Sequence, residues 1–319
     1  MQNYVFGADI GGTSVKLGLF STDGKLLERW EIPTRTVNGG NHVLPDVAQS
    51  ITAAMGRHEI SADQVAGIGI GVPGPVDERF TVNKCVNLGW GVFNIKERMN
   101  ELLPNIPHVA AGNDANVAAL GELWQGGGRG NQSAVMITLG TGVGGGVVLD
   151  GKIVAGNNGG AGEIGHMTVE PGETVTCSCG KCGCLEQYTS ARGVVRMAKV
   201  MLAESDTPSK LRGVEDFNSK HICDFAVAGD HMALKIIDRF GDYLGRAMSY
   251  ISCTVDPDIF IIGGGMSKAG DIVTNAALKY FQKYAFHACR GTKILLAELG
   301  NDAGAYGAWK LALDAFGER

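Results

Sequence analysis

The sequence predicts an α/β protein built from two related domains. A buried strand, a turn of Gly and Thr, a second strand, an Asp-Gly turn and a third strand follow one another around Gly11-Gly12 and again around Gly140 to Gly142. Asp-Gly between two β-rich runs is a strong signal for a β-hairpin. After Asp230 strands and helices alternate, which predicts a sheet that is at least partly parallel. The length of 319 residues also fits about two domains.

Three antiparallel strands are expected to open the first domain. An amphipathic helix follows, then a buried Gly-rich strand that Pro73-Gly74-Pro75 stops, an irregular loop at 86–90, and a short strand before Asn113-Asp114, where a helix begins. The expected strands cover 4–9, 15–20, 26–32, 65–72 and 109–112, and the helix covers 44–55.

The second domain is expected to repeat the hairpins and then to alternate strand and helix. Asp230 caps a long helix that ends at Asp256-Pro257, and the segment 204–220 has the composition of a polar surface excursion. The expected strands cover 134–139, 145–149, 152–155, 259–262 and 293–297, and shorter helices cover 191–202 and 272–286. We expect the small domain to span 1–115 with the C-terminal helix 303–319, and the large domain to span 116–302.

Composition and charge exclude several classes of function. The net charge is -5, and no run of Lys or Arg offers the clustered basic surface that nucleic acid or an anionic membrane requires. The N-terminal segment lacks the basic and apolar regions of a secretory signal, and no stretch is long and apolar enough to cross a bilayer. We therefore expect a cytoplasmic protein with a small polar or anionic ligand and no nucleic-acid or membrane partner.

Two glycine turns have the chemistry of phosphate binding. Glycine makes up 48 residues, about twice the average share, and it gathers at a few turns where backbone approaches something closely. The first turn combines the carboxylate of Asp9, the N–H groups of Gly11, Gly12 and Thr13, and the amine of Lys16, which suit the oxygens of a Mg²⁺-bound phosphate. A single such turn is usually an ordinary hairpin, but the copy at 140–142 favours phosphate binding.

The segment from Gly140 to Gly145 also matches the dinucleotide fingerprint GxGxxG. That motif requires a helix directly after the turn, whereas the residues from Gly146 onward have the pattern of a hairpin. A Walker P-loop is absent from the sequence. We therefore expect no Rossmann site.

Asn113-Asp114 has two compatible interpretations. An Asn or Asp before a helix usually caps it. A carboxylate at this point can also accept the proton of a substrate hydroxyl, and phosphoryl transfer needs little base strength because its transition state is loose. We expect Asn113 to cap the helix and Asp114 to act as the base.

The stretch from Gly159 to Glu186 holds four of the eight cysteines, one His and several carboxylates. Its C-x-C-x-x-C-x-C pattern has the spacing of thiolates around tetrahedral Zn²⁺, and disulfides are disfavoured in a cytoplasmic chain. Spacing alone leaves both Cys₄ and Cys₃His ligand sets open. Glu163, His166 and Glu186 flank the cysteines, and although such residues are more often solvated or structural, their place around a metal favours recognition of a polyol.

These motifs together resemble a known family. Gly162-Glu-Ile-Gly-His166, followed by the cysteines and Glu186, resembles the signature of the ROK family of repressors and sugar kinases, and the resemblance extends over nearly the whole chain. Asp9 to Thr13 and Leu139 to Gly142 resemble its phosphate motifs, and Gly263 to Gly265 its adenosine motif. Within the family the chain is most similar to bacterial ATP-dependent glucokinases, with matching segments at 86–90, 113–116 and 118–122.

The resemblance implies a fold of two actin-like (ribonuclease H-like) domains around a central cleft, and it implies roles for individual residues. Asp114 is the implied general base, and the sugar-binding residues are Gly74, Asn87, Asn113, Asp114, Glu163, His166 and Glu186. The implied nucleotide-binding residues are Asp9, Gly11, Gly12, Thr13, Lys16, Gly140, Thr141, Gly142, Gly264 and Gly265. The implied ligands of a structural Zn²⁺ are His166, Cys177, Cys179 and Cys184, and Cys182 occupies a variable position of the family pattern.

The expected function is ATP-dependent phosphorylation of D-glucose at its 6-hydroxyl, with ATP and Mg²⁺, in a homodimer. The alternative of a kinase for another hexose or N-acetylhexosamine stays open, because the preference of a sugar pocket depends on single substituents of the sugar. Such substrates include N-acetylmannosamine, N-acetylglucosamine, allose and fructose. A sugar-sensing repressor is less expected, since only eight residues precede Asp9 and leave no room for a helix-turn-helix. A non-catalytic sugar-binding protein would make the phosphate turns superfluous.

Overall fold

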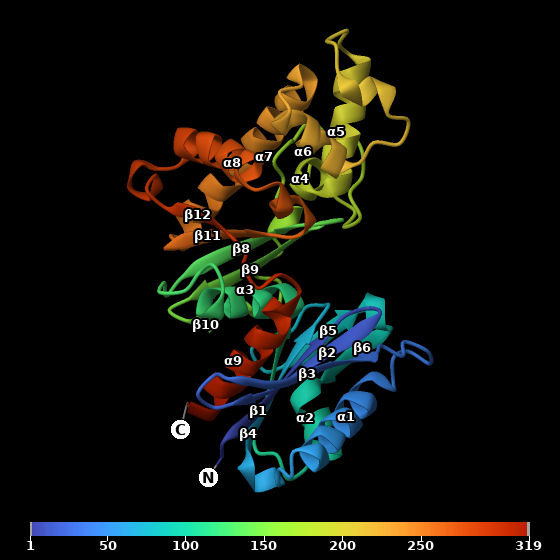
Figure 1. Cartoon of the computed structure of the whole chain (residues 1–319), viewed down its shortest axis with the longest axis vertical. Helices are drawn as coiled ribbons and strands as arrows, with labels where there is room; N and C mark the ends of the chain where they lie inside the picture. Colours follow the sequence, from blue (N-terminus) through green and yellow to red (C-terminus); the bar gives the residue numbers. More distant parts are fainter. Residues whose placement is uncertain (1, 318–319) are drawn as a thin grey trace. The chain divides into compact units, whose positions relative to one another are not determined.

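The computed structural model describes residues 2–317 and divides into two compact units (Figure 1). The first unit contains residues 2–132, 146–162 and 298–317, and the second unit contains residues 133–145 and 163–297. The chain therefore passes between the units four times, and one of these passages falls within a strand. The limits of the two domains expected from the sequence stay a prediction.

The first unit is built on a five-stranded mixed sheet. Its order is β3-β2-β1-β4-β7, in which β1, β2 and β3 are antiparallel, while β4 runs parallel to both β1 and β7. The three opening strands and the short strand before Asn113 are thus confirmed. The strands are β1 (Tyr4–Ile10), β2 (Ser14–Ser21), β3 (Leu26–Pro33), β4 (Val65–Val72) and β7 (Val109–Asn113).

Helices cover both faces of this sheet because alternate residues of its strands are apolar on both sides. Phe6, Ala8 and Ile10 pack into a core with the apolar stripe of α1 (Val43–Arg57) and with α2 (Ile95–Leu102). On the opposite face, Val5 and Phe20 pack against Trp309 of α9 (Ala303–Gly317), which lies beside α3 (Asp114–Gln125) (Figure 1).

The second sheet repeats the arrangement of the first. Its order is β10-β9-β8-β11-β12, with β11 parallel to β8 and to β12 and with β9 and β10 antiparallel. The repetition confirms an α/β fold of two actin-like domains, and the β9–β10 hairpin confirms that no helix follows Gly145. The strands are β8 (Ala134–Leu139), β9 (Val143–Leu149), β10 (Lys152–Ile153), β11 (Ile259–Gly263) and β12 (Lys293–Leu296).

A long helix dominates the second unit. Asp230 caps α7 by accepting hydrogen bonds from the N–H groups of Met232 and Ala233, and the helix ends at Val255, followed by Asp256 in a left-handed conformation before Pro257. Both limits agree with the sequence prediction. The helices of this unit are α4 (Glu186–Thr189), α5 (Ala191–Ala203), α6 (Ser219–Val227), α7 (His231–Val255) and α8 (Asp271–Tyr284).

Several elements of the structure were not expected. A two-stranded sheet of β5 (Thr81–Cys85) and β6 (Trp90–Asn94) surrounds the loop at 86–90, which itself contains a 3₁₀ turn, and α2 follows it directly. Within the expected polar excursion, α6 begins at Ser219. Both helices are short, and each buries only two or three side chains, so the sequence offers few positions from which to recognise a helical stripe.

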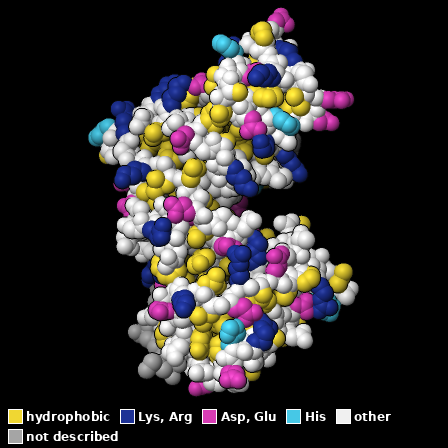
Figure 2. All heavy atoms as spheres, in the orientation of Figure 1, with side chains coloured by type: hydrophobic (Ala, Val, Ile, Leu, Met, Phe, Trp, Pro, Cys, Tyr) yellow, Lys and Arg dark blue, Asp and Glu magenta, His cyan; other side chains and the backbone are white. Residues whose placement is uncertain are grey.

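Charged side chains of both signs lie on the surface (Figure 2). On the face drawn in Figure 2, basic and acidic side chains are interspersed, and neither sign gathers into one large patch. Among residues 2–317, no helix combines the length and the apolar character that crossing a bilayer requires.

Candidate active site and metal centre

The start of α3 holds the expected base. Asn113 caps the helix, because its side-chain oxygen accepts the N–H groups of Ala115 at 3.0 Å and Asn116 at 3.2 Å. Its amide nitrogen donates to the backbone oxygen of Gly74 at 3.2 Å. Asp114 is the next residue and is half-buried. The cap thus ties two expected sugar-site residues together and places the carboxylate of Asp114 at a fixed helix start.

The turn that contains Gly74 is supported from the other side by Cys85 at the end of β5. The Cys85 thiol donates to the backbone oxygen of Pro73 at 3.1 Å, and a Cβ atom on Gly74 would come within 3.3 Å of its sulfur. Burial raises the pKa of the Cys85 thiol, and the negative charge of Asp114 acts in the same direction. Cys85, Gly74 and Asp114 therefore lie close together. Asn87 follows Cys85 by two residues and is exposed.

The first glycine turn connects β1 to β2. The N–H of Gly11 donates to the backbone oxygen of Ser14 at 2.9 Å, while Gly12 and Thr13 are exposed at its tip. Asp9, at the end of β1, lies so close to α9 that a Cβ atom on Gly304 would be 2.3 Å from its carboxylate. Burial raises the pKa of Asp9, and the positive charge of Lys16 opposes that effect. An acid, a cation and the exposed residues of the turn thus occur together.

The second glycine turn connects β8 to β9 in the second unit. Its closing bond runs from the N–H of Gly140 to the backbone oxygen of Gly142 at 3.0 Å. Directly after it, the N–H of Val143 donates to the carboxylate of Glu186 at 3.0 Å. Gly264 (φ +84°) lies against the end of β8, because a Cβ atom there would be 2.6 Å from the backbone of Leu139. The structure therefore places Gly264 of the expected adenosine motif beside Leu139 of the second expected phosphate motif.

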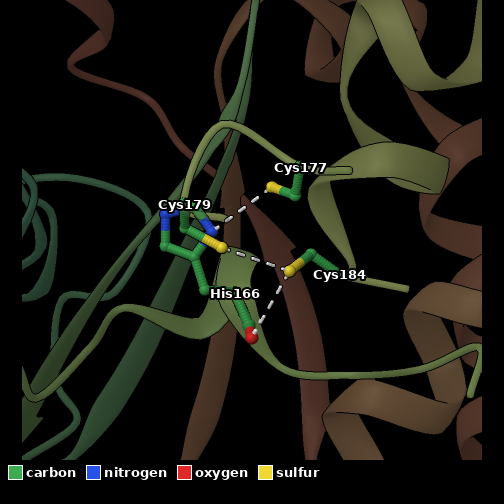
Figure 3. A group of neighbouring side chains, drawn as sticks. All are labelled: His166, Cys177, Cys179 and Cys184. Carbon is green, nitrogen blue, oxygen red and sulfur yellow. Dashed lines mark hydrogen bonds between the residues drawn. The ribbon is translucent and has the colours of Figure 1, made fainter. Parts of the chain in front are cut away.

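Four side chains of the second unit converge on one point (Figure 3). The potential ligand atoms all lie within 4.8 Å of one another; their residues are His166, Cys177, Cys179 and Cys184. Nδ1 of His166 is 3.8 Å from the sulfur of Cys177. Three sulfurs and one imidazole nitrogen at these separations fit a tetrahedral cation of the Zn²⁺ type.

Cys182 lies outside this group. Its thiol donates to the backbone oxygen of Thr174 at 3.8 Å. Spacing left the Cys₄ and Cys₃His ligand sets open, and of these two the structure assembles Cys₃His. Burial raises the pKa of Cys184, whereas the backbone N–H of Lys181 lowers that of Cys179. A divalent cation among the sulfurs would offset the burial of thiolates.

The two other expected polyol contacts lie beside the cysteine group. Nε2 of His166 faces away from the cysteines and is 4.0 Å from a carboxylate oxygen of Glu163, which is about half exposed. Glu186 accepts from the hydroxyl of Ser178 at 3.3 Å with one oxygen and from Val143 with the other. Glu186 therefore joins the cysteine-bearing loop at 177–184, called the metal loop after its potential ligands, to the second glycine turn, a role for which the sequence offers no signal.

Sequence reasoning also missed the anchor of this loop. Glu173 accepts the hydroxyl of Tyr188 at 2.6 Å and the guanidinium of Arg196 at 2.7 Å, and Glu170 accepts the hydroxyl of Tyr243 at 3.0 Å. The two tyrosine rings stack with their centroids 4.2 Å apart. The loop is thus fixed to α4, α5 and α7 by contacts that are independent of a metal.

The duplicated sheets, the two glycine turns and the carboxylate at the start of α3 define the class: two-domain, actin-like proteins of the sugar-kinase type. The chain belongs to the ROK family, which it matches over residues 5–315. The cysteine group and both turns lie within that match.

Three relatives illustrate the similarity. A glucokinase of Halalkalibacterium halodurans is 39% identical over 311 residues, covering 96% of this chain and 94% of the relative. An N-acetylgalactosamine kinase of Shewanella sp. is 31% identical, covering 95% and 94%. A crystal structure of a ROK family glucokinase from Streptomyces griseus, in complex with glucose and AMPPNP, is 32% identical with a TM-score of 0.69, covering 98% and 99%.

Proposed function

We propose that this protein is an ATP-dependent glucokinase, which transfers the γ-phosphoryl group of ATP to the 6-hydroxyl of D-glucose. The observation that carries the proposal is the start of α3, where Asn113 holds Asp114 beside the Gly74 turn, in a ROK member that is 39% identical to a glucokinase. A half-buried carboxylate at a fixed helix start suits proton acceptance from a bound hydroxyl.

In the proposed reaction Asp114 takes the proton of the 6-hydroxyl. The freed oxygen forms a bond to the γ-phosphorus, the bond from that phosphorus to the β–γ bridging oxygen breaks, and ADP leaves with the electron pair. The transition state is loose, so positioning and charge compensation contribute more than base strength. Asp114 needs only to hold the hydroxyl and to accept its proton.

The sugar is proposed to be oriented by two sets of residues: Asn87 with the Gly74 turn, and Glu163 with His166 and Glu186. Carboxylates and an imidazole nitrogen accept or donate hydrogen bonds to several hydroxyls at once. Nε2 of His166 suits this role because Nδ1 of the same ring faces the cysteines.

The phosphate chain is proposed to bind to the N–H groups of the two glycine turns, with Lys16 and Asp9 beside the first turn. Bound Mg²⁺ would supply positive charge that offsets the triphosphate, and Mg²⁺ prefers one or two carboxylates together with phosphate oxygens. Burial raises the pKa of the Asp9 carboxyl, and a bound cation would offset that cost by stabilising the ionised form. Gly264 and Gly265 would lie beside the nucleoside, where side chains would interfere.

A structural Zn²⁺ is part of the proposal. His166, Cys177, Cys179 and Cys184 would hold it, and it would fix the loop that carries the sugar-binding groups. We further propose that the protein is cytoplasmic, because thiols in this arrangement persist where the environment is reducing. We also propose a homodimer, which is what the resemblance to the family suggests. Sedimentation velocity tests the dimer.

A second candidate is a kinase for an N-acetylhexosamine, which the 31% identity to an N-acetylgalactosamine kinase favours. The deciding experiment is an ADP-release assay with Mg-ATP across hexoses and N-acetylhexosamines. The expected result is the highest kcat/KM with D-glucose and a product that glucose-6-phosphate dehydrogenase oxidises. Preference for an N-acetylhexosamine would select the second candidate, and no turnover with any sugar would contradict both.

A further inference from the structure

Glu122, near the end of α3, is a buried carboxylate that takes no part in the proposed chemistry. It is 0% exposed. A buried carboxylate is costly unless donors satisfy it, so its partners show what it does. Those partners are three backbone N–H groups.

Two short segments provide these donors. One oxygen of Glu122 accepts the N–H of Gly127 at 3.1 Å and the N–H of Glu298 at 2.9 Å, and the other accepts the N–H of Leu299 at 2.8 Å. Hydrogen bonds to an ionised acceptor are stronger than neutral ones. Glu122 therefore fixes the backbone of Glu298 and Leu299 to the end of α3.

Glu298 and Leu299 lie at one of the four passages of the chain between the two units. The chain re-enters the first unit between Ala297 and Glu298. The N–H of Ala297 donates to the backbone oxygen of Ile262 at 3.0 Å, within the second unit, and the next N–H donates to Glu122, within the first. Consecutive amides are thus held by different units, which confines free rotation to the backbone dihedrals of Ala297.

A second passage of the chain is built in the same way. The backbone oxygen of Gln132 accepts the N–H of Gly151 at 2.8 Å within the first unit. The N–H of the following residue, Ser133, donates to the carboxylate of Asp258 at 2.9 Å within the second unit. At both passages a carboxylate, Glu122 or Asp258, accepts a hydrogen bond from a backbone N–H at the boundary. Neither passage is therefore a flexible linker.

The segment that Glu122 fixes also supports the first phosphate turn. The backbone oxygen of Asn301 accepts the amine of Lys16 at 3.1 Å, and Gly304 abuts the carboxylate of Asp9. If Glu298 moved, the start of the segment that contains Asn301 and Gly304 would move with it. The contact therefore connects the passage between the units to the groups proposed to meet phosphate.

We propose that Glu122 is a positioning residue for phosphoryl transfer: it fixes the passage at Ala297 as a pivot, so that closure of the two units brings sugar and nucleotide into one geometry. This inference rests on the proposed kinase function, in which closure excludes water and completes the site. Hinges of this kind need few residues, and those residues lie away from the chemistry.

The test compares the wild-type protein with Glu122→Gln. The amide keeps the shape but turns an N–H₂ group toward backbone donors, so protection from hydrogen exchange at Glu298 and Leu299 should fall by about tenfold or more. We expect kcat with glucose and ATP to fall by about tenfold, while KM for the sugar changes less. The compaction on adding glucose, measured as a decrease in the radius of gyration, should be smaller than in the wild type. Glu122→Asp, which keeps the charge, provides a second variant if Glu122→Gln does not fold, and its losses should be smaller.

Asp230→Asn is the matched control, because Asp230 also accepts three backbone N–H groups but lies far along the chain from either passage. It should lower the melting temperature while leaving kcat unchanged. Normal kcat and normal glucose-induced compaction in folded Glu122→Gln would overturn the proposal, as would a loss of kcat with unchanged compaction. If the wild-type protein itself turns over no glucose, the kinase function fails, and the exchange measurement still reports whether Glu122 holds the passage.

Discussion

The sulfurs of Cys179 and Cys184 lie 3.6 Å apart. This separation is too long for a disulfide, and it is close to the edge of a tetrahedron, about 3.8 Å, whose corners are about 2.3 Å from a central Zn²⁺. The two residues reach this geometry from a loop that Glu173 and Glu170 also anchor. The group of potential metal ligands is therefore preorganised by hydrogen bonds.

Cys184→Ser should remove the metal. A hydroxyl is a poor ligand for Zn²⁺, and the buried position of Cys184 leaves no room for a substitute. Elemental analysis should find about one Zn²⁺ per chain in the wild type and much less in the variant, and the melting temperature should fall by about 10 °C because site formation is coupled to folding.

Cys182→Ser is the control for that prediction. The thiol of Cys182 donates a hydrogen bond to the backbone oxygen of Thr174 and lies outside the group of four potential ligands. It should retain the metal and the melting temperature. The ligand set would be wrong if Cys182→Ser lost the metal and Cys184→Ser kept it.

The fold was largely predictable because its signals are local. The Asp-Gly turns at Gly24 and Gly151, the caps at Asn113 and Asp230 and the buried runs of the strands all depend on neighbouring residues, and they predicted most of the succession of strands and helices along the chain. The β5–β6 hairpin escaped prediction because strand Thr81–Cys85 alternates poorly, and its pairing with β6 is decided by packing rather than by propensity.

The site was predictable only in part. Residue types at close spacing identified the cysteine group and the glycine turns, whose members are neighbours in the chain. The bonds from Glu186 to Val143 and from Glu122 to Glu298 join residues far apart in the sequence. A single Glu in a sequence carries no sign of such partners, since most are solvated. Long-range satisfaction of carboxylates is therefore information that only the structure provides.

Asp114→Ala should abolish turnover while leaving the binding of glucose within about threefold, because the methyl group can neither orient the 6-hydroxyl nor accept its proton. A fall in kcat of about 10³-fold or more is expected for removal of a positioned base. Coupled assay of ADP release and calorimetric titration with glucose provide the two numbers.

Asp271→Ala is the matched control, since Asp271 is likewise the first residue of its helix, α8, and is exposed. It should retain wild-type kcat. Near-normal kcat in Asp114→Ala would refute the role of Asp114 as base.

Gly40→Ala should weaken sugar binding through the loop at 86–90. Gly40 has φ +67°, and a Cβ atom there would be 2.3 Å from the backbone oxygen of Leu88 and 2.6 Å from the indole nitrogen of Trp90, which donates to Gly40 at 3.0 Å. The loop that carries Asn87 must shift, so KM for glucose should rise by about tenfold with kcat less affected.

Gly91→Ala tests whether that effect is specific. Gly91 lies next to the same loop, but a Cβ atom there would meet nothing within 4 Å. Initial-rate measurements over a range of glucose concentrations should show an unchanged KM. Equal KM values for wild type and Gly40→Ala would contradict a sugar-binding role for the loop.

Glu173 should stabilise the metal loop in a pH-dependent way. The hydrogen bond from Tyr188, with those from the Val175 N–H and Arg196, lowers the pKa of Glu173 from its ordinary 4.5 to about 2, against the opposing effect of burial. Because the pKa is lower in the folded state, the stabilisation is complete above about pH 5 and is lost as pH falls toward 2.

Glu173→Gln should therefore lower the free energy of unfolding at pH 7 by on the order of 2 kcal/mol, and the difference from wild type should shrink between about pH 5 and pH 3. Urea unfolding of both proteins at each pH measures it, and since both carry the same cysteines, acid release of a metal affects them alike. Glu215→Gln, at an exposed position, should change stability by less than about 0.5 kcal/mol. A Glu173→Gln difference that stays constant from pH 7 to pH 3 would show that the charge of Glu173 is not what holds the loop.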